Sequence, residues 1–110
     1  RVQIARAIIT DPKLLLLDEP TASLDLGARE ELLQLLAGFA AAPTTPAMIM
    51  VTHHVEEIPV GFTHALLLRD GAVVAQGPIA ESLTSHTLAD TFGLAIELTQ
   101  ENGRYSARAA

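Results

Sequence analysis

The sequence predicts an α/β fold built around two parallel strands. Two short apolar runs, LLLL at residues 14–17 and MIMV at 48–51, each end in polar residues. Runs this short and uniform are typical of strands that are buried on both faces of a parallel sheet. The segment between the two runs has helical periodicity from residue 25 to about residue 41. We therefore expect strands at 14–18 and 47–52, with flanking helices.

The chain begins with a segment of helical character. Apolar residues recur through residues 1–10 with a spacing that predicts a helix. Asp11-Pro12 ends this helix, because the residue before a proline disfavours helical geometry. The strand at 14–18 follows directly.

Asp25 is a plausible N-cap for the helix that precedes the second strand. The positions spaced as one face of this helix are apolar, and we expect them to form its buried side. They are Ala28, Leu32, Leu35, Leu36 and Phe39. A loop follows at residues 43–46. After the strand at 47–52, a short helical turn is expected around residues 55–58, ended by Pro59.

Two hairpins are expected in the last part of the chain. Residues 64–70 and 72–76 flank Asp70-Gly71, a pair typical of the type I′ turn that joins antiparallel strands. Gly77-Pro78 opens a short helix with proline at its first position, and another helix is expected near 86–92. Residues 96–98 and 104–107 form the second hairpin, around residues 101–103.

Composition and charge limit the classes of function. A length of 110 residues allows one domain at most. The composition, 49% hydrophobic and 18% charged, indicates a globular chain. The net charge is −6, and this argues against a nucleic-acid-binding face as the main function. No stretch approaches the roughly 18 apolar residues of a transmembrane helix. Cysteine is absent, so the chain has neither disulfides nor thiolate metal ligands.

Two adjacent acids, Asp18 and Glu19, close the first apolar run. A carboxylate at the C-terminal end of a parallel strand lies at the rim where open α/β sheets bind ligands. Two acids side by side repel each other, so a positive group is expected nearby. A magnesium–phosphate complex would supply that charge. Because turns also favour Asp, the strand and Asp18 alone leave a purely structural role open.

Four motifs in order resemble the nucleotide-binding domain of ATP-binding-cassette (ABC) proteins. LLLLDEP at 14–20 is similar to the Walker B strand, and SLD at 23–25 is similar to the D-loop. VTH at 51–53 resembles the switch-histidine strand. RVQIARAI at 1–8 resembles the helix that follows the family signature motif. The resemblance is strong over residues 1–83 and weak over 84–110, where a helix and a hairpin extension are expected.

The resemblance implies a role for three residues in ATP hydrolysis. Asp18 matches the aspartate that holds Mg²⁺, usually through water. Glu19 matches the general base that polarises the attacking water. His53 matches the switch histidine, whose ring contacts the γ-phosphate and that water. Adjacent residues of a strand point to opposite faces, so the pair of His53 and His54 is a poor candidate for a zinc site. His54 departs from the family pattern.

The D-loop residues carry a second expectation. Asp25 and Ser23 match a loop that crosses the dimer interface and helps to align the opposite active site. An N-cap role for Asp25 is compatible with this one. The sequence TASLD at 21–25 resembles the transporter ATPases within the family, which favours membrane transport. VTHHVEEIP at 51–59 and TFGL at 91–94 are more similar to the ATPases that take up small solutes or metal chelates.

The resemblance covers only part of the ABC domain. The phosphate-binding loop GxxxxGK[ST], the glutamine loop and the glycine-rich signature do not occur in these 110 residues. The chain is thus expected to be the C-terminal half of a three-layer P-loop NTPase domain. On its own it should lack ATPase activity and self-associate through exposed apolar faces and sheet edges.

The resemblance also implies cofactors, partners and a location. These are ATP and Mg²⁺, a second copy of the ATPase subunit, transmembrane permease subunits and no nucleic acid. The location would be cytoplasmic, at the inner face of the cell membrane. Two alternatives stay open: a non-catalytic assembly module, and an ABC ATPase that does not serve transport.

Overall fold

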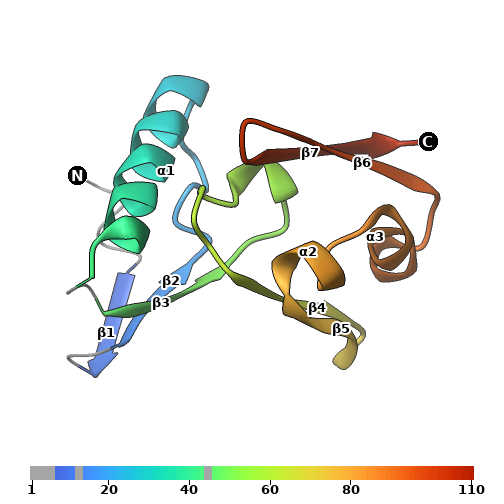
Figure 1. Cartoon of the computed structure of the whole chain (residues 1–110), viewed down its shortest axis with the longest axis horizontal. Helices are drawn as coiled ribbons and strands as arrows, with labels where there is room; N and C mark the ends of the chain where they lie inside the picture. The colour runs from blue at the N-terminus through green and yellow to red at the C-terminus, as the bar shows by residue number, and fades with distance from the viewer. Residues whose placement is uncertain (1–6, 12–13, 44–45) are drawn as a thin grey trace. The chain divides into compact units, whose positions relative to one another are not determined.

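The computed structural model describes residues 7–11, 14–43 and 46–110, and it divides the chain into two compact units. The first unit spans Arg1–Gly61 and the second Phe62–Ala110. Figure 1 shows the chain from its N-terminus in blue to its C-terminus in red.

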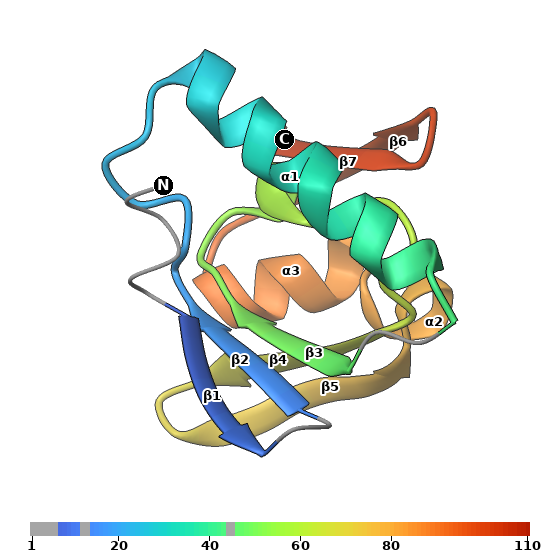
Figure 2. The ribbon, with the colours of Figure 1, turned by 90° about the vertical axis from the view of Figure 1, so that its left-hand side faces the viewer.

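The first unit contains a three-stranded sheet in the order β1-β2-β3. The strands are β1 (Ala7–Asp11), β2 (Leu14–Asp18) and β3 (Ala47–Val51). β2 is central, antiparallel to β1 and parallel to β3, and Figure 2 shows the three strands side by side. The predicted parallel pairing of the two apolar runs is confirmed, although β3 ends one residue earlier than expected.

The strand β1 corrects the prediction of a helix over residues 1–10. Residues 1–6 lie outside the described residues, but Ala7–Asp11 is extended and pairs with β2. Ile8, Ile9 and Thr10 are β-branched and favour extended structure. The free edge of β2 supplies the hydrogen-bonding partner, and this pairing outweighs the helical spacing of the apolar residues.

Helix α1 (Leu26–Ala41) packs on the sheet of the first unit. Its N-cap is Asp25, as predicted, since one carboxylate oxygen accepts a hydrogen bond from the Ala28 amide at 2.8 Å. The core forms where Leu32 and Leu36 meet Leu17 of β2. Four further side chains pack against this core, namely Leu15, Leu24, Met48 and Met50.

The expected buried face of α1 is partly wrong. Leu32 and Leu36 are buried, but Leu35 and Phe39 are exposed, and Leu33, which the spacing excluded, is 2% exposed. The apolar residues of α1 cover more than one stripe, so spacing alone does not decide which of them faces the sheet.

The sheet is also less deeply buried than the apolar runs suggest. Only Leu17 of β2 is fully buried, and β3 alternates, with Ile49 and Val51 exposed. The expectation that both strands are buried on two faces is therefore wrong for this chain. A short 3₁₀ helix, η2 (Val55–Glu57), follows β3 at the predicted turn.

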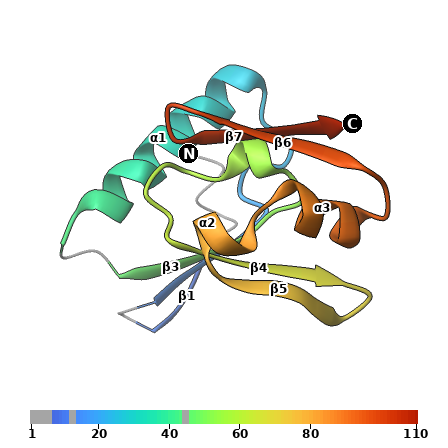
Figure 3. The ribbon, with the colours of Figure 1, turned by 45° about the vertical axis from the view of Figure 1, so that its right-hand side comes forward.

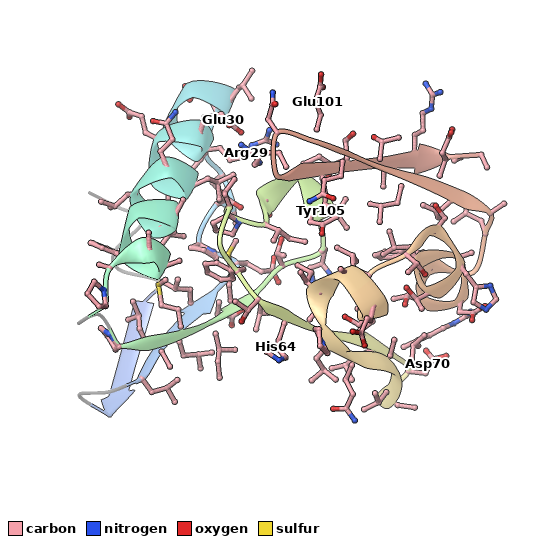
Figure 4. All side chains as sticks on the ribbon, in the orientation of Figure 1. Arg29, Glu30, His64, Asp70, Glu101 and Tyr105 are labelled. Carbon is pink, nitrogen blue, oxygen red and sulfur yellow. The ribbon has the colours of Figure 1, made fainter. Side chains whose placement is uncertain are left out.

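The second unit contains the two predicted hairpins. The first pairs β4 (His64–Arg69) with β5 (Ala72–Pro78), and the second pairs β6 (Ile96–Glu101) with β7 (Arg104–Ala109). Both pairs are antiparallel (Figure 3). Asp70 and Gly71 both have positive φ, as a type I′ turn requires. Figure 4 labels Asp70 at the tip of the first hairpin and Glu101 beside the turn of the second.

Two short helices lie between the hairpins. α2 (Ile79–Ser82) begins after Pro78, which is its N-cap and not its first helical residue as predicted. α3 (Ser85–Phe92) begins at a capping box formed by Thr84 and Thr87. It ends at Gly93 in the left-handed region, with φ of 78°. In the described part of the chain, no helix is long and apolar enough to cross a membrane.

Candidate functional site

The candidate site lies at the C-terminal ends of β2 and β3. Because these strands are parallel and Asp18 is paired with Val51, the residues that follow each strand emerge at the same sheet edge. The backbone amide of Glu19 donates a hydrogen bond to the Val51 carbonyl at 2.8 Å. This bond extends the ladder one step beyond β2 and fixes the backbone of Glu19 against the end of β3.

The structure brings Glu19 and His53 together. His53 Nε2 lies 3.2 Å from Glu19 Oε2, a distance at which a ring N–H can donate to the carboxylate. The Glu19 side chain is 44% exposed and the His53 side chain 68% exposed. The pair is therefore accessible to water and to a ligand from this edge of the sheet.

Glu19 holds an uncommon backbone conformation. Its φ is 48°, in the left-handed region that residues other than glycine rarely adopt. The cost of such a conformation is on the order of 1–2 kcal/mol for an L-residue. This conformation is stabilised by the hydrogen bond from the Glu19 amide to the Val51 carbonyl and by Pro20, which follows Glu19 and is fully buried. Strained residues of this kind gather at functional sites.

Asp18 is the exposed last residue of β2. Among the residues that the structure describes, no hydrogen bond or ion pair engages its carboxylate, so its oxygens are available. In the same described ranges, no three His, Asp or Glu side chains gather as a metal cluster. A single free carboxylate fits Mg²⁺, because this ion keeps several waters and takes few protein ligands.

The loop between Glu19 and α1 carries the D-loop candidates. Buried Thr21 accepts from the Leu24 amide through its carbonyl at 3.1 Å, which closes the turn before the helix. Ser23 has φ of 70° and is exposed, and Asp25 is exposed as the N-cap of α1. The structure thus exposes both residues to solvent, and neither is a partner in the Glu19–His53 contact.

The loop after β3 contains a contact that the sequence does not reveal. Thr52 Oγ1 donates to Glu57 Oε1 at 2.5 Å and accepts from the His54 amide at 3.2 Å. Thr52 and Glu57 are five residues apart, which corresponds to neither helical nor strand periodicity. His54 is exposed and precedes η2 as its N-cap residue.

Comparison with known proteins places these motifs in a family. No protein-family model matches the chain. The ABC transporter ATP-binding protein YlmA of Bacillus subtilis is 43% identical over 94% of this chain and 39% of its own length. The molybdenum import ATP-binding protein ModC of Shewanella oneidensis is 42% identical over 80% of this chain and 24% of its own length.

A solved structure supports the same assignment. An ABC transporter assigned to the metal-chelate type, in an inward-facing conformation, superimposes with a TM-score of 0.70 and 28% identity. The match covers 89% of this chain and 39% of that chain. The α/β arrangement is therefore part of an ABC ATPase fold.

The chain is similar to ABC transporter ATP-binding proteins over most of its length, and its motifs match the C-terminal half of their nucleotide-binding domain. It spans well under half the length of the curated relatives that it matches.

Proposed function

We propose that this chain supplies part of the ATP-hydrolysing site of an ABC transporter ATP-binding subunit. The observation that carries this proposal is the contact between Glu19 and His53 across the ends of two parallel strands. This edge is where open α/β sheets bind ligands. The similarity to ATP-binding proteins supports ATP as that ligand.

In the proposed mechanism, Glu19 is the general base. Its half-exposed carboxylate takes a proton from the attacking water, while the hydrogen bond from the Glu19 amide to the Val51 carbonyl keeps the backbone of Glu19 in place. His53 Nε2–H donates to Glu19 Oε2 and turns the ring toward the same edge. In the complete protein the ring also contacts the γ-phosphate. Phosphoryl transfer depends mainly on such positioning and on electrostatic stabilisation.

Asp18 is the proposed magnesium residue. Its exposed carboxylate would hold the ion through water, next to the phosphates of ATP. When bound, Mg²⁺ neutralises negative charge that develops on the phosphate oxygens. The carboxylate of Asp18 also orients the ion relative to Glu19, one residue away along the chain.

Ser23 and Asp25 are the proposed contacts with a second copy of the ATPase subunit. Both are exposed, and the N-cap bond of Asp25 fixes the loop from which they project. We take residues 1–110 as the C-terminal portion of one ATPase domain, with residues 84–110 as its extension. The complete subunit would act with transmembrane permease subunits at the cytoplasmic face of the membrane.

For the transported substrate we propose a small solute or a metal chelate. The relative ModC is named for molybdenum import, and the solved structure that matches is assigned to the metal-chelate type. These names support import of a small solute or a metal chelate over export of a large substrate.

The test uses a complete domain. In the YlmA fusion, this chain replaces the matching 104 residues of YlmA from Bacillus subtilis. We expect the purified fusion to hydrolyse ATP in a Mg²⁺-dependent manner, with wild-type YlmA as the control. The 110 residues alone should show no turnover, because they contain no phosphate-binding loop. A folded fusion that binds ATP without hydrolysing it would favour a non-catalytic module.

A further inference from the structure

His53 needs an external means of positioning. Its side chain is 68% exposed, and Glu19 is the partner recorded for its ring among the described residues. An exposed ring that is held by one contact samples several rotamers unless its backbone is fixed. The residues that set the backbone of the loop at 52–54 therefore determine whether His53 faces Glu19.

Thr52 fixes that backbone through two hydrogen bonds. Its hydroxyl oxygen accepts from the His54 amide at 3.2 Å, closing a turn around His53. Its single hydroxyl hydrogen has two acceptors in range, the Glu57 carboxylate at 2.5 Å and the His54 carbonyl at 3.5 Å. The shorter, charge-assisted bond to Glu57 is the stronger one.

Glu57 is itself held in place. It belongs to η2, where its amide donates to the His54 carbonyl at 3.0 Å. Pro59 follows two residues later and is fully buried, which anchors the end of the turn. Glu57 thus connects a fixed 3₁₀ turn to the end of β3, and the loop that carries His53 is fastened at both ends.

We propose that Thr52 and Glu57 are positioning residues for His53 in the ATPase reaction. They form a clamp, the Thr52–Glu57 pair, that holds the loop at 52–54 so that His53 Nε2 stays opposite Glu19 Oε2. This inference rests on the proposed function for its catalytic meaning. Its structural content can be tested separately.

The first test reads the loop by NMR in the YlmA fusion, where the rest of YlmA completes the domain. In Thr52→Val, a near-isosteric change without the hydroxyl, the His54 amide should exchange about five- to tenfold faster. This factor corresponds to the loss of one typical hydrogen bond. Thr52→Ser retains the hydroxyl and should restore slow exchange. Thr63→Val is the matched control, because the Thr63 hydroxyl contacts the His64 ring in the second unit.

The second readout is the ring ¹⁵N spectrum of His53 at fixed pH. Glu19→Ala defines the signal of a ring that has lost its hydrogen-bond acceptor at this position. We expect Thr52→Val and Glu57→Ala to move the Nε2 signal toward that reference, and Glu57→Gln, which keeps an acceptor oxygen, to move it less. The double variant should add little to either single one, because both remove the same clamp.

The YlmA fusion supplies the functional readout. Thr52→Val and Glu57→Ala should lower kcat with little change in KM for ATP, and Thr52→Ser should recover it. A His53 signal that is unchanged in both Thr52→Val and Glu57→Ala would overturn the clamp, whatever the ATPase rate of these variants. Conversely, a shifted His53 signal in a fusion that never hydrolyses ATP would count against the proposed function alone.

Discussion

At the residue scale, the candidate site depends on two backbone features next to its acidic residues. Glu19 lies in the left-handed region, and its amide is bonded to the end of β3. Neither feature follows from the sequence. The residue before a proline is expected to be extended, and nothing in the DEP motif indicates positive φ. The identities of Asp18, Glu19 and His53 as candidates were predictable, because short motifs carry them.

We expect different effects from substituting the two adjacent histidines. His53 contacts Glu19, whereas His54 is exposed beyond the strand and has no such contact. We expect His53→Ala to reduce ATP turnover of the YlmA fusion by roughly 10²-fold or more, a size typical of a lost catalytic hydrogen-bonding group. His54→Ala is the matched control and should retain most of the activity. Equal losses in steady-state ATPase assays would contradict this assignment.

At the element scale, the N-cap of α1 and the turn of the first hairpin were predictable from sequence, and exposure was not. The Asp25 cap and the Asp70-Gly71 turn depend on local chemistry that a few residues encode. By contrast, the strand at Ala7–Asp11 depends on pairing with β2. The buried side of α1 depends on which segments pack around the helix, so Leu33 is buried, whereas Leu35 is exposed although its spacing predicted burial.

Loss of the helix cap should destabilise the chain. Asp25→Ala removes the acceptor for the Ala28 amide, and we expect the free energy of unfolding to fall by about 1 kcal/mol. Asp25→Ser retains a capping oxygen, so its free energy of unfolding should fall by much less. Urea denaturation followed by circular dichroism measures both. An unchanged midpoint in Asp25→Ala would show that the cap contributes nothing.

Two glycines should respond to alanine in opposite directions. An added Cβ meets no atom within 4 Å at Gly38 or at Gly71, so packing does not distinguish them. Gly38 lies within α1, where alanine should stabilise by about 0.5–1 kcal/mol. Gly71 has φ of 78°, where alanine should destabilise by about 1–2 kcal/mol. Denaturation midpoints that shift in the same direction would contradict this account of the turn.

At the scale of the whole molecule, the chain exposes large apolar side chains in both units. Ile49 and Val51 lie on β3, and Leu66, Leu68 and Val73 lie on the hairpin of β4 and β5. Surfaces of this kind favour association, so we expect the 110 residues alone to form dimers or larger species at high concentration. Light scattering over a dilution series measures this. A monodisperse monomer at every concentration would contradict the expectation.

The fold class and family were predictable because motif order and spacing carry them, and the structural match agrees. The extent of burial was not predictable, because it depends on which neighbours cover each face of the sheet and of the helices. The proposed roles of Asp18 and Glu19 also depend partly on the sequence motif and partly on the fold. The sequence supplies the two acids, and the parallel pairing of β2 with β3 brings Glu19 next to His53.

The most direct test of the account is the ATPase rate of the YlmA fusion that carries Glu19→Gln. This change keeps the size of the side chain and its ability to accept from His53, but it removes the base. We predict a loss of turnover of roughly 10²–10⁴-fold with ATP binding preserved. Turnover close to that of the unaltered fusion would contradict the claim that Glu19 is the general base.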